Sequence, residues 1–259
     1  MRILITGSDG YIGTHLSKTL KLQGYDVLGM DLPNCILTSE IPQDIDWIIH
    51  LAAASRIGEC IDDPARAYSI NVTGTAKIID HASRNKIGVI FASTSCIYDT
   101  EDTAYQSTKI QAEAVIDYYR RHCGLHATVL RFFNVYGHKA WPWPSLVMDI
   151  FLKCYRDGKD LPIYGDGSCR RNFIHLDDVA SAVTACMEKR PGINLDVGSD
   201  DTVSIADLAS WFGCKVKHWP SRSFDAVVRE GPPNRTKEVL DWKPVRRLKD
   251  FVVDCLAHR

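Results

Sequence analysis

A tyrosine and a lysine, Tyr105 and Lys109, have the types and the spacing needed for acid–base chemistry. Because they are four residues apart on a predicted helix, their side chains lie on one helix face. A free tyrosine has a pKa of about 10 and is a poor base at neutral pH. A nearby ammonium favours the phenolate and lowers that pKa, so Tyr105 could remove the proton of a substrate hydroxyl.

A hydroxyl partner for this pair is expected at the end of the strand before the helix, where it would bind and orient the reacting oxygen. The run FASTSCIY over residues 91–98 provides Ser93, Thr94 and Ser95 at this point. The spacing alone leaves open which of the three hydroxyls takes that role.

A glycine loop near the start of the chain predicts a dinucleotide site. Gly7, Gly10 and Gly13 form a G-x-x-G-x-x-G pattern between a predicted strand and a predicted helix. Glycines let the backbone approach a pyrophosphate, and the helix N-terminus supplies N–H donors and a favourable dipole. Asp31 closes the next strand 18 residues after Gly13, where its carboxylate would accept hydrogen bonds from ribose hydroxyls. Such a carboxylate would repel a 2′-phosphate, so the pattern favours NAD over NADP.

NAD completes the chemistry that the tyrosine begins. Hydride could leave the substrate carbon for the nicotinamide while Tyr105 takes the hydroxyl proton. A nicotinamide cation would also add to the lysine's effect on the pKa of Tyr105.

The elements that must position these residues alternate between strands and helices. Apolar runs predict strands over residues 3–6, 26–30, 47–51, 89–92 and 128–131, and allow a further short strand over 35–37. Helical spacing of apolar residues predicts helices from Ile12 onward, over 65–85 and over 105–122. This order predicts an α/β fold with a Rossmann-type, doubly wound parallel sheet.

The alternation breaks down after about Gly137, where prolines become frequent. We expect residues 1–137 to form an NAD-binding Rossmann domain with later segments interleaved. Residues 138–259 are expected to form a small, loop-rich and mainly substrate-binding part rather than more sheet.

Composition narrows the class of protein. The 259 residues carry a formal net charge of −1, so no basic excess points to nucleic acid or to an anionic membrane surface. Nine scattered cysteines without a C-x-x-C predict free thiols rather than a zinc site or a disulfide framework, and we expect no metal. The chain shows no signal-peptide pattern and no apolar run of transmembrane length, so we expect a cytoplasmic protein.

The chain resembles the extended short-chain dehydrogenases/reductases, in particular the NAD-dependent sugar-nucleotide epimerase/dehydratase group. The resemblance runs from Met1 to about Pro244. It is carried by separate stretches at residues 7–13, 50–53, 71–75, 91–98, 105–109, 131–137 and 165–178.

The resemblance implies roles for single residues. It makes Thr94 the catalytic hydroxyl, Tyr105 the base and Lys109 a ligand of the nicotinamide ribose. Cofactor contacts are implied for Gly7, Gly10, Tyr11, Ile12, Gly13, Asp31, Leu51, Ala52, Ala53 and Asn71. Substrate contacts are implied for Asn134 near the phosphates and for Arg171 and Arg229 on the nucleotide diphosphate, whose oxygens match guanidinium forks.

The expected activity is epimerisation of a nucleotide-diphosphate sugar, at C4, through transient oxidation with tightly bound NAD. Alternatives are an NAD-dependent dehydrogenase or reductase of such sugars, and a non-catalytic NAD-binding regulatory protein. The resemblance also implies a homodimer that pairs through the helices after Pro64 and after Ala104. Ile110, Ala114 and Tyr118 lie four apart and could form the contact stripe, although the same stripe could equally face the sheet.

Several departures from the family limit what carries over. Dehydratases of this family place an Asp-Glu pair directly after the catalytic threonine, and the related decarboxylases keep the Glu. Here the two positions are Ser95 and Cys96, so we expect neither dehydration nor decarboxylation. Only six residues separate Tyr98 from Tyr105, and the segment 32–44 is short for a helix plus a strand. The stretch 231–234 is also shorter than usual, and Asn172 stands where Asp is commoner.

Overall fold

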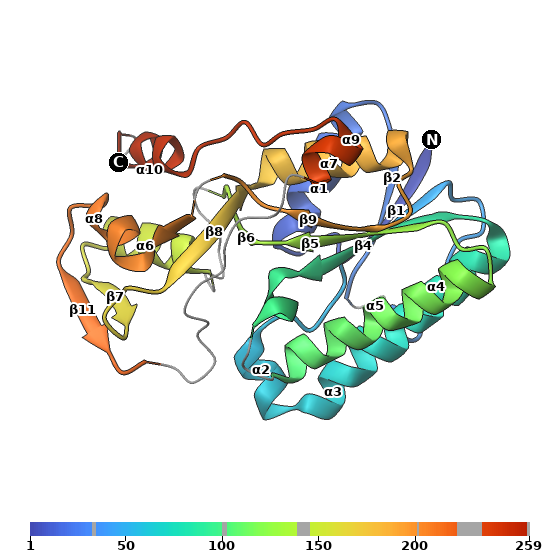
Figure 1. Ribbon diagram of the computed structural model, residues 1–259, viewed down its shortest axis with the longest axis horizontal. Coiled ribbons are helices and arrows are strands. Elements are labelled where there is room, and N and C mark those ends of the chain that lie inside the picture. Colours follow the sequence, from blue (N-terminus) through green and yellow to red (C-terminus); the bar gives the residue numbers. More distant parts are fainter. Residues whose placement is uncertain (33–34, 100–102, 139–145, 201, 222–234, 258–259) are drawn as a thin grey trace. The chain divides into compact units, whose positions relative to one another are not determined.

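A parallel sheet of apolar strands, most of them from the first half of the chain, forms the centre of the Rossmann-type part of the fold (Figure 1). The computed structural model describes the chain except residues 33–34, 100–102, 139–145, 201, 222–234 and 258–259. These described residues divide into two units. The first comprises Met1–Ile97, Asp102–Arg131 and Ala180–Leu195, and the second comprises Tyr98–Glu101, Phe132–Val179 and Asp196–Arg259.

The sheet has six strands in the order β2-β1-β3-β4-β5-β9. Its strands are β1 (Arg2–Thr6), β2 (Asp26–Met30), β3 (Trp47–His50), β4 (Gly88–Thr94), β5 (Ala127–Phe132) and β9 (Asn194–Val197). The β1–β2, β1–β3 and β3–β4 pairs are parallel. Every residue of β3 is buried, as expected for a strand covered on both faces. The predicted Rossmann-type α/β class is confirmed.

Helices cover both faces of this sheet. On one face, α4 (Thr75–Asn85) and α5 (Ala104–His122) bury Ile78, Ile79, Ala112 and Ile116 against the strands. Figure 1 shows α1 (Tyr11–Leu22) and α7 (Leu176–Lys189) on the opposite face. A capping box at Thr103 starts α5, because its side chain accepts from the Gln106 N–H and the Gln106 side chain accepts in return from the Thr103 N–H.

The expected helix over 65–85 is interrupted. It consists of α3 (Pro64–Tyr68), a π-helical turn (Ser69–Gly74) and α4, and α2 (Ile57–Asp62) precedes it. A π-turn shifts the helical register by one residue and often occurs at functional sites.

The allowed strand over 35–37 is wrong, because this segment forms a turn. Ile36 enters the core there, and the Lys77 ammonium donates to the Leu37 and Ser39 carbonyls at 3.1 and 2.9 Å. These contacts hold the segment against α4. Among the residues that the structure describes, β2 is the edge strand on that side of the sheet.

The second unit has its own core and more strand than expected. One sheet has the order β10-β8-β6, from β10 (Thr202–Ser204), β8 (Arg170–His175) and β6 (Asn134–Tyr136), and a second pairs β11 (Val216–Trp219) with β7 (Leu161–Tyr164). Helices α6 (Val147–Arg156), α8 (Ile205–Ser210), α9 (Arg235–Leu240) and α10 (Leu248–Ala257) complete the described part of the unit. Tyr136, Phe151, Phe173 and Phe212 lie in its core. The expectation of a loop-rich part without further sheet was wrong, because strands this short show no readable periodicity.

All nine cysteines are free thiols. Within the described ranges, no helix is both long enough and apolar enough to cross a membrane.

Candidate functional site

The glycine loop follows β1 and is shaped by close backbone contacts. Gly7 has a φ of 75°, a left-handed conformation that favours glycine. A Cβ on Gly7 would lie 2.7 Å from the Ala52 nitrogen, and one on Gly13 would overlap the Gly7 carbonyl oxygen. Gly10 is the N-cap of α1, and Tyr11 begins that helix with Ile12 next in its first turn. The loop can therefore present backbone N–H groups at a helix N-terminus, as a pyrophosphate requires.

Three predicted cofactor contacts meet at one edge of the sheet. Because β1 pairs in parallel with β2 on one side and with β3 on the other, the residues after these strands, Gly7, Asp31 and Leu51, lie at the same carboxyl edge. Asp31 accepts hydrogen bonds from the Asp9 N–H at 2.9 Å and from the Leu32 N–H at 2.8 Å. These bonds orient the half-buried carboxylate beside the glycine loop.

The loop after β3 is braced by Asn71. The Asn71 carbonyl oxygen Oδ1 accepts from the Ala54 N–H at 2.8 Å, and its Nδ2 donates to the Ala54 carbonyl and to Thr108 Oγ1, each at 3.0 Å. Asn71 is buried in the π-helical turn, and both of its amide hydrogens are used by protein groups. Leu51, Ala52 and Ala53, the other predicted contacts here, are half-buried in the loop that it holds.

His50, at the end of β3, links this loop to β1. Burial and the charge of Lys109 lower its pKa to about 3, so the imidazole is neutral. The Thr75 hydroxyl donates its one hydrogen to the Asn71 carbonyl at 2.6 Å, so it must accept from His50 Nε2 at 3.0 Å. His50 Nδ1 therefore accepts from the Thr6 hydroxyl at 2.6 Å. The sequence did not indicate this network, which orients the residues next to the loop after β3.

The three predicted catalytic residues come from β4 and α5 of the first unit. Thr94 ends β4, and its Oγ1 accepts from the Cys96 N–H at 3.1 Å, which leaves its hydrogen available to donate. Tyr105 is half-buried in the first turn of α5. Lys109 is only 3% exposed; its ammonium donates to the Ala92 carbonyl at 2.5 Å and lies 4.1 Å from the centroid of the Phe91 ring.

Burial decides the protonation chemistry of Lys109. Desolvation lowers its pKa from the usual 10.5 to about 7, while the negative charge of Glu113 opposes that fall. Glu113 is a second buried residue that the sequence reasoning missed. Its position, one helical turn after Lys109 on the same face, is the sequence signal that could have indicated it.

The predicted substrate contacts belong to the second unit. Asn134 is half-buried on β6, and its Nδ2 donates to the Asn172 carbonyl at 2.8 Å. Arg171 is buried on β8, and its Nη1 donates to the Arg170 carbonyl at 3.0 Å. The β6–β8 register places these two residues close together at one end of that strand pair. Arg229 lies outside the described residues.

Asn172 has a structural place in the second unit. It is 0% exposed, and its Nδ2 donates to the Ser199 carbonyl and to Thr202 Oγ1 at 2.8 and 3.2 Å. Its Oδ1 accepts from the Ser199 N–H at 3.0 Å. The amide at this position therefore holds the loop between β9 and β10, and it uses donors that an Asp would lack.

The first unit thus fits a dinucleotide, since a Cβ would obstruct the glycine loop and a carboxylate stands at the next strand end. Residues 3–198 match the profile of the NAD dependent epimerase/dehydratase family. The chain belongs to this family. Its cofactor is NAD, and the resemblance seen in the motifs is confirmed.

Relatives and solved structures agree with this assignment. A UDP-N-acetyl-alpha-D-glucosaminuronate decarboxylase of Bacillus cytotoxicus is 29% identical, covering 96% of this chain and 91% of its own length. A putative UDP-glucose 4-epimerase of Methanocaldococcus jannaschii is 27% identical, with 96% and 95% covered. The structure of UDP-glucose 4-epimerase from Thermotoga maritima with UDP-glucose superposes with a TM-score of 0.92 at 23% identity, covering 100% and 98% of the two chains, which shows a shared fold.

These relatives are UDP-sugar epimerases and decarboxylases, so the family resemblance alone does not separate the two activities. The alignment with an uncharacterized UDP-glucose epimerase of Bacillus subtilis extends over 310 positions, although this chain has 259 residues. That relative therefore carries insertions relative to this chain, in line with the short segments noted in the sequence.

Proposed function

We propose that the protein is an epimerase of nucleotide-diphosphate sugars that acts at C4 by transient oxidation with tightly bound NAD. The observation that carries the proposal is the placement of Thr94, Tyr105 and Lys109 on β4 and α5 of the unit that has the dinucleotide loop. These groups suffice to move one proton and one hydride at a single carbinol carbon.

NAD supplies the hydride acceptor when it is bound. The Lys109 ammonium favours the phenolate of Tyr105, which takes the proton of the C4 hydroxyl. Thr94, whose oxygen already accepts from the Cys96 N–H, donates its hydrogen to the reacting oxygen. Epimerisation follows when the 4-keto sugar rotates in the site and hydride then returns to the opposite face of C4. For the second unit we propose that Arg171 and Asn134 bind the diphosphate, together with Arg229.

Dehydratases of the family that this chain resembles carry an Asp-Glu pair beside the catalytic threonine and the related decarboxylases keep the Glu, whereas this chain has neither acid there. The residues that follow Thr94 are Ser95 and Cys96, both buried. A serine hydroxyl cannot serve as an acid or base near neutral pH without activation. This difference supports an epimerase over a decarboxylase, even though decarboxylases are among the relatives.

The test is a panel of UDP-, dTDP-, GDP- and CDP-hexoses and UDP-glucuronate, with products followed by mass spectrometry and NMR. An epimer keeps its mass, whereas dehydration removes water and decarboxylation removes carbon dioxide. Tyr105→Phe should lose about 10²–10⁴-fold in turnover. Tyr119→Phe, which removes a hydroxyl bonded to Asp80 near the other end of α5, is the matched control and should keep its activity. Accumulation of a lighter product would refute the proposal.

A dehydrogenase or reductase is the second candidate, and it would release its cofactor at each turnover. Denaturing the purified protein and measuring the released nucleotide separates the two, because an epimerase that recycles its cofactor should carry NAD through purification. The presence of all three expected catalytic residues, Thr94, Tyr105 and Lys109, also argues against a non-catalytic NAD-binding role.

We further propose a cytoplasmic homodimer that pairs through α3 and α5. Ile110 and Tyr118 are 47% and 55% exposed, and Ala114 between them is exposed as well. The stripe therefore faces away from the sheet, on the side of α5 where a partner helix could pack. Light scattering of the wild type and of Ile110→Asp at micromolar concentration tests the proposal, since a wild-type monomer would contradict it.

A further inference from the structure

The carboxylate of Glu113 is buried at the junction of one helix and three strands. The Ser93 hydroxyl on β4 donates to its Oε1 at 2.5 Å. Arg131 on β5 donates through Nη2 to Oε2 at 2.6 Å and through Nε to Oε1 at 3.1 Å, so the two side chains form a fork-to-fork pair. Asn194 at the start of β9 donates from Nδ2 to Oε2 at 3.1 Å. All four residues belong to the first unit.

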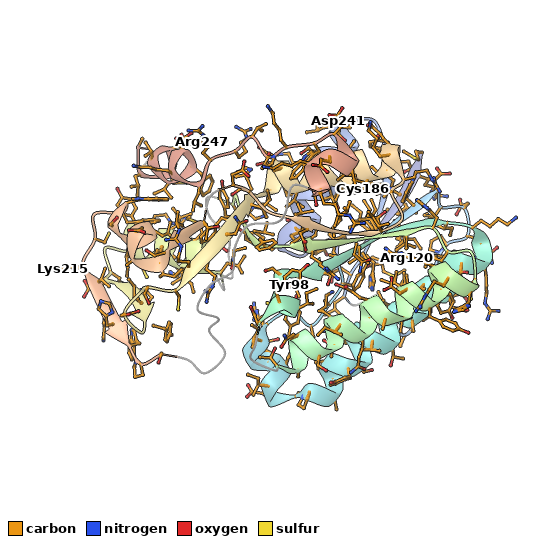
Figure 2. All side chains as sticks on the ribbon, viewed as in Figure 1. Tyr98, Arg120, Cys186, Lys215, Asp241 and Arg247 are labelled. Atoms are coloured by element: carbon orange, nitrogen blue, oxygen red, sulfur yellow. The ribbon has the colours of Figure 1, made fainter. Side chains whose placement is uncertain are left out.

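Arg120, labelled in Figure 2, extends this network further along α5. Its Nη1 donates to Asn194 Oδ1 at 2.6 Å and to Asp117 Oδ1 at 2.7 Å. The Asn194 amide is therefore held from both sides, with its oxygen toward Arg120 and its nitrogen toward Glu113. Each guanidinium has its own carboxylate, Arg131 with Glu113 and Arg120 with Asp117.

Stability alone is a weak reason for such a network. Replacing a buried ion pair by apolar residues of similar volume is often neutral or stabilising, because taking both charges out of water costs more than their attraction returns. What a buried, fully bonded carboxylate does provide is a defined geometry between the elements it joins.

The elements joined here are those that carry the catalytic residues. Glu113 follows Lys109 by one helical turn and Tyr105 by two, and Ser93 directly precedes Thr94. We propose that Glu113 is a positioning residue for the oxidation step, because it fixes α5 to the end of β4 and keeps a negative charge beside Lys109. This inference rests on the proposed function.

The charges around Lys109 indicate what Glu113 does electrostatically. Lys109 interacts electrostatically with Glu113 on its own helix and with His50 on β3, and His50 is neutral. Tyr105 precedes Lys109 by one helical turn. Glu113 is in turn faced by Arg131 on β5 and lies within the electrostatic reach of Arg120. Burial lowers the pKa of Lys109, and Glu113 is the group that raises it again. Without this carboxylate Lys109 loses its proton at lower pH, and the phenolate of Tyr105 then loses the positive charge that stabilises it.

The experiment compares Glu113→Gln, Glu113→Asp and Ser93→Ala in the NAD-loaded enzyme, with folding checked by circular dichroism. Glu113→Gln should lower kcat by about 10²-fold, the scale of a small misplacement of reacting groups, with little change in KM. The alkaline limb of its kcat–pH profile should move down by about one pH unit. Glu113→Asp and Ser93→Ala disturb the contact between α5 and β4, so they should lower kcat. Both keep the carboxylate charge, so they should leave the alkaline limb in place.

The matched control is Asp80→Asn, which removes a carboxylate and an ion pair with Arg84 from α4, outside the Glu113 network. It should leave both kcat and the limb unchanged. An unmoved alkaline limb in Glu113→Gln, or an equal movement in Asp80→Asn, would overturn the proposal.

A measurement without sugar keeps this inference separate from the proposed function. NMR titration of 13C-labelled lysine follows Lys109 directly, with its signal assigned by its loss in Lys109→Met. A lower Lys109 pKa in Glu113→Gln supports the electrostatic role even if the wild type epimerises no sugar, which would refute only the function. An identical Lys109 titration in both proteins would overturn the role of Glu113 whatever the activity.

Discussion

Lys109→Met should show how much folding stability is lost by burying the ammonium of Lys109. Methionine has a similar length and is apolar, so it fills the same space without a charge. A tenfold change in a protonation equilibrium corresponds to about 1.4 kcal/mol. A fall of the lysine pKa from 10.5 to about 7 therefore corresponds to about 5 kcal/mol, which is lost when the charged form is buried.

The sign of the pH dependence follows from linkage. Between pH 7 and 10.5 the unfolded chain keeps the lysine proton and the folded chain releases it, so wild-type stability rises with pH across this window. The variant has no such titration. Its stability advantage over the wild type is therefore largest below about pH 7 and shrinks by about 1.4 kcal/mol for each pH unit above it.

Urea unfolding of cofactor-free wild type and Lys109→Met at pH 7, 8 and 9 measures this change. Titrations common to both proteins cancel in the difference, and the lost bond to the Ala92 carbonyl adds only a constant. Lys153→Met, at a half-exposed lysine paired with Asp157, is the control and should show no such trend. A constant difference between wild type and Lys109→Met across these pH values would refute the lowered pKa.

Four further variants test the local geometry within each unit. Gly13→Ala should abolish NAD binding in calorimetry, because its Cβ overlaps the Gly7 carbonyl, whereas Gly10→Ala, whose Cβ lies 3.2 Å from the same oxygen, should bind NAD more weakly but measurably. Asn172→Asp should lower the free energy of unfolding by about 1–3 kcal/mol, because the Ser199 carbonyl loses its donor. Gly58→Ala in α2 should raise it by about 0.5–1 kcal/mol, since the added Cβ meets nothing within 4 Å. Equal NAD affinity of the two loop variants, or a stable Asn172→Asp, would contradict the geometry described above.

The first unit could be predicted closely from the sequence because its signals are local. The strand over 26–30 and the helix over 105–122 have clear apolar periodicity, and the structure places them within one residue of those bounds. The π-helical turn at Ser69–Gly74 could not be predicted in this way, since one extra residue within a helical run leaves the apolar pattern nearly unchanged.

The second unit was predicted less well for a physical reason. Its strands are three to six residues long, and β7 contains Pro162. A strand of this length completes too few alternations to be distinguished from a loop, and proline in a sequence favours the interpretation as loop. Its small sheets form because the aromatic residues Tyr136, Phe151 and Phe173 bury together, which is a contact over a long sequence distance.

The hydrogen bonds of the buried polar groups in the first unit also could not be predicted from the sequence, although they hold the candidate site together. Asn71 is the clearest example. The resemblance implies that it contacts the cofactor, and the structure shows its amide bonded to the Ala54 backbone and to Thr108. The Thr108 hydroxyl in turn donates to the Tyr105 carbonyl at 2.8 Å.

A continuous set of oriented hydrogen bonds therefore runs from the loop after β3 to α5, the helix that carries the proposed catalytic Tyr105. It begins at Thr6 and His50 beside the loop and passes through Thr75 and Asn71 to Thr108 on α5. Because each hydrogen in this set has one possible direction, rotating any member would leave a buried donor or acceptor unpaired, at about 1–3 kcal/mol. The network thus holds the strand ends that would bind NAD in register with the helix turn that carries Tyr105. The proposed reaction needs hydride and proton acceptors in a fixed relation, and these buried polar contacts would provide it together with the apolar packing of the two elements.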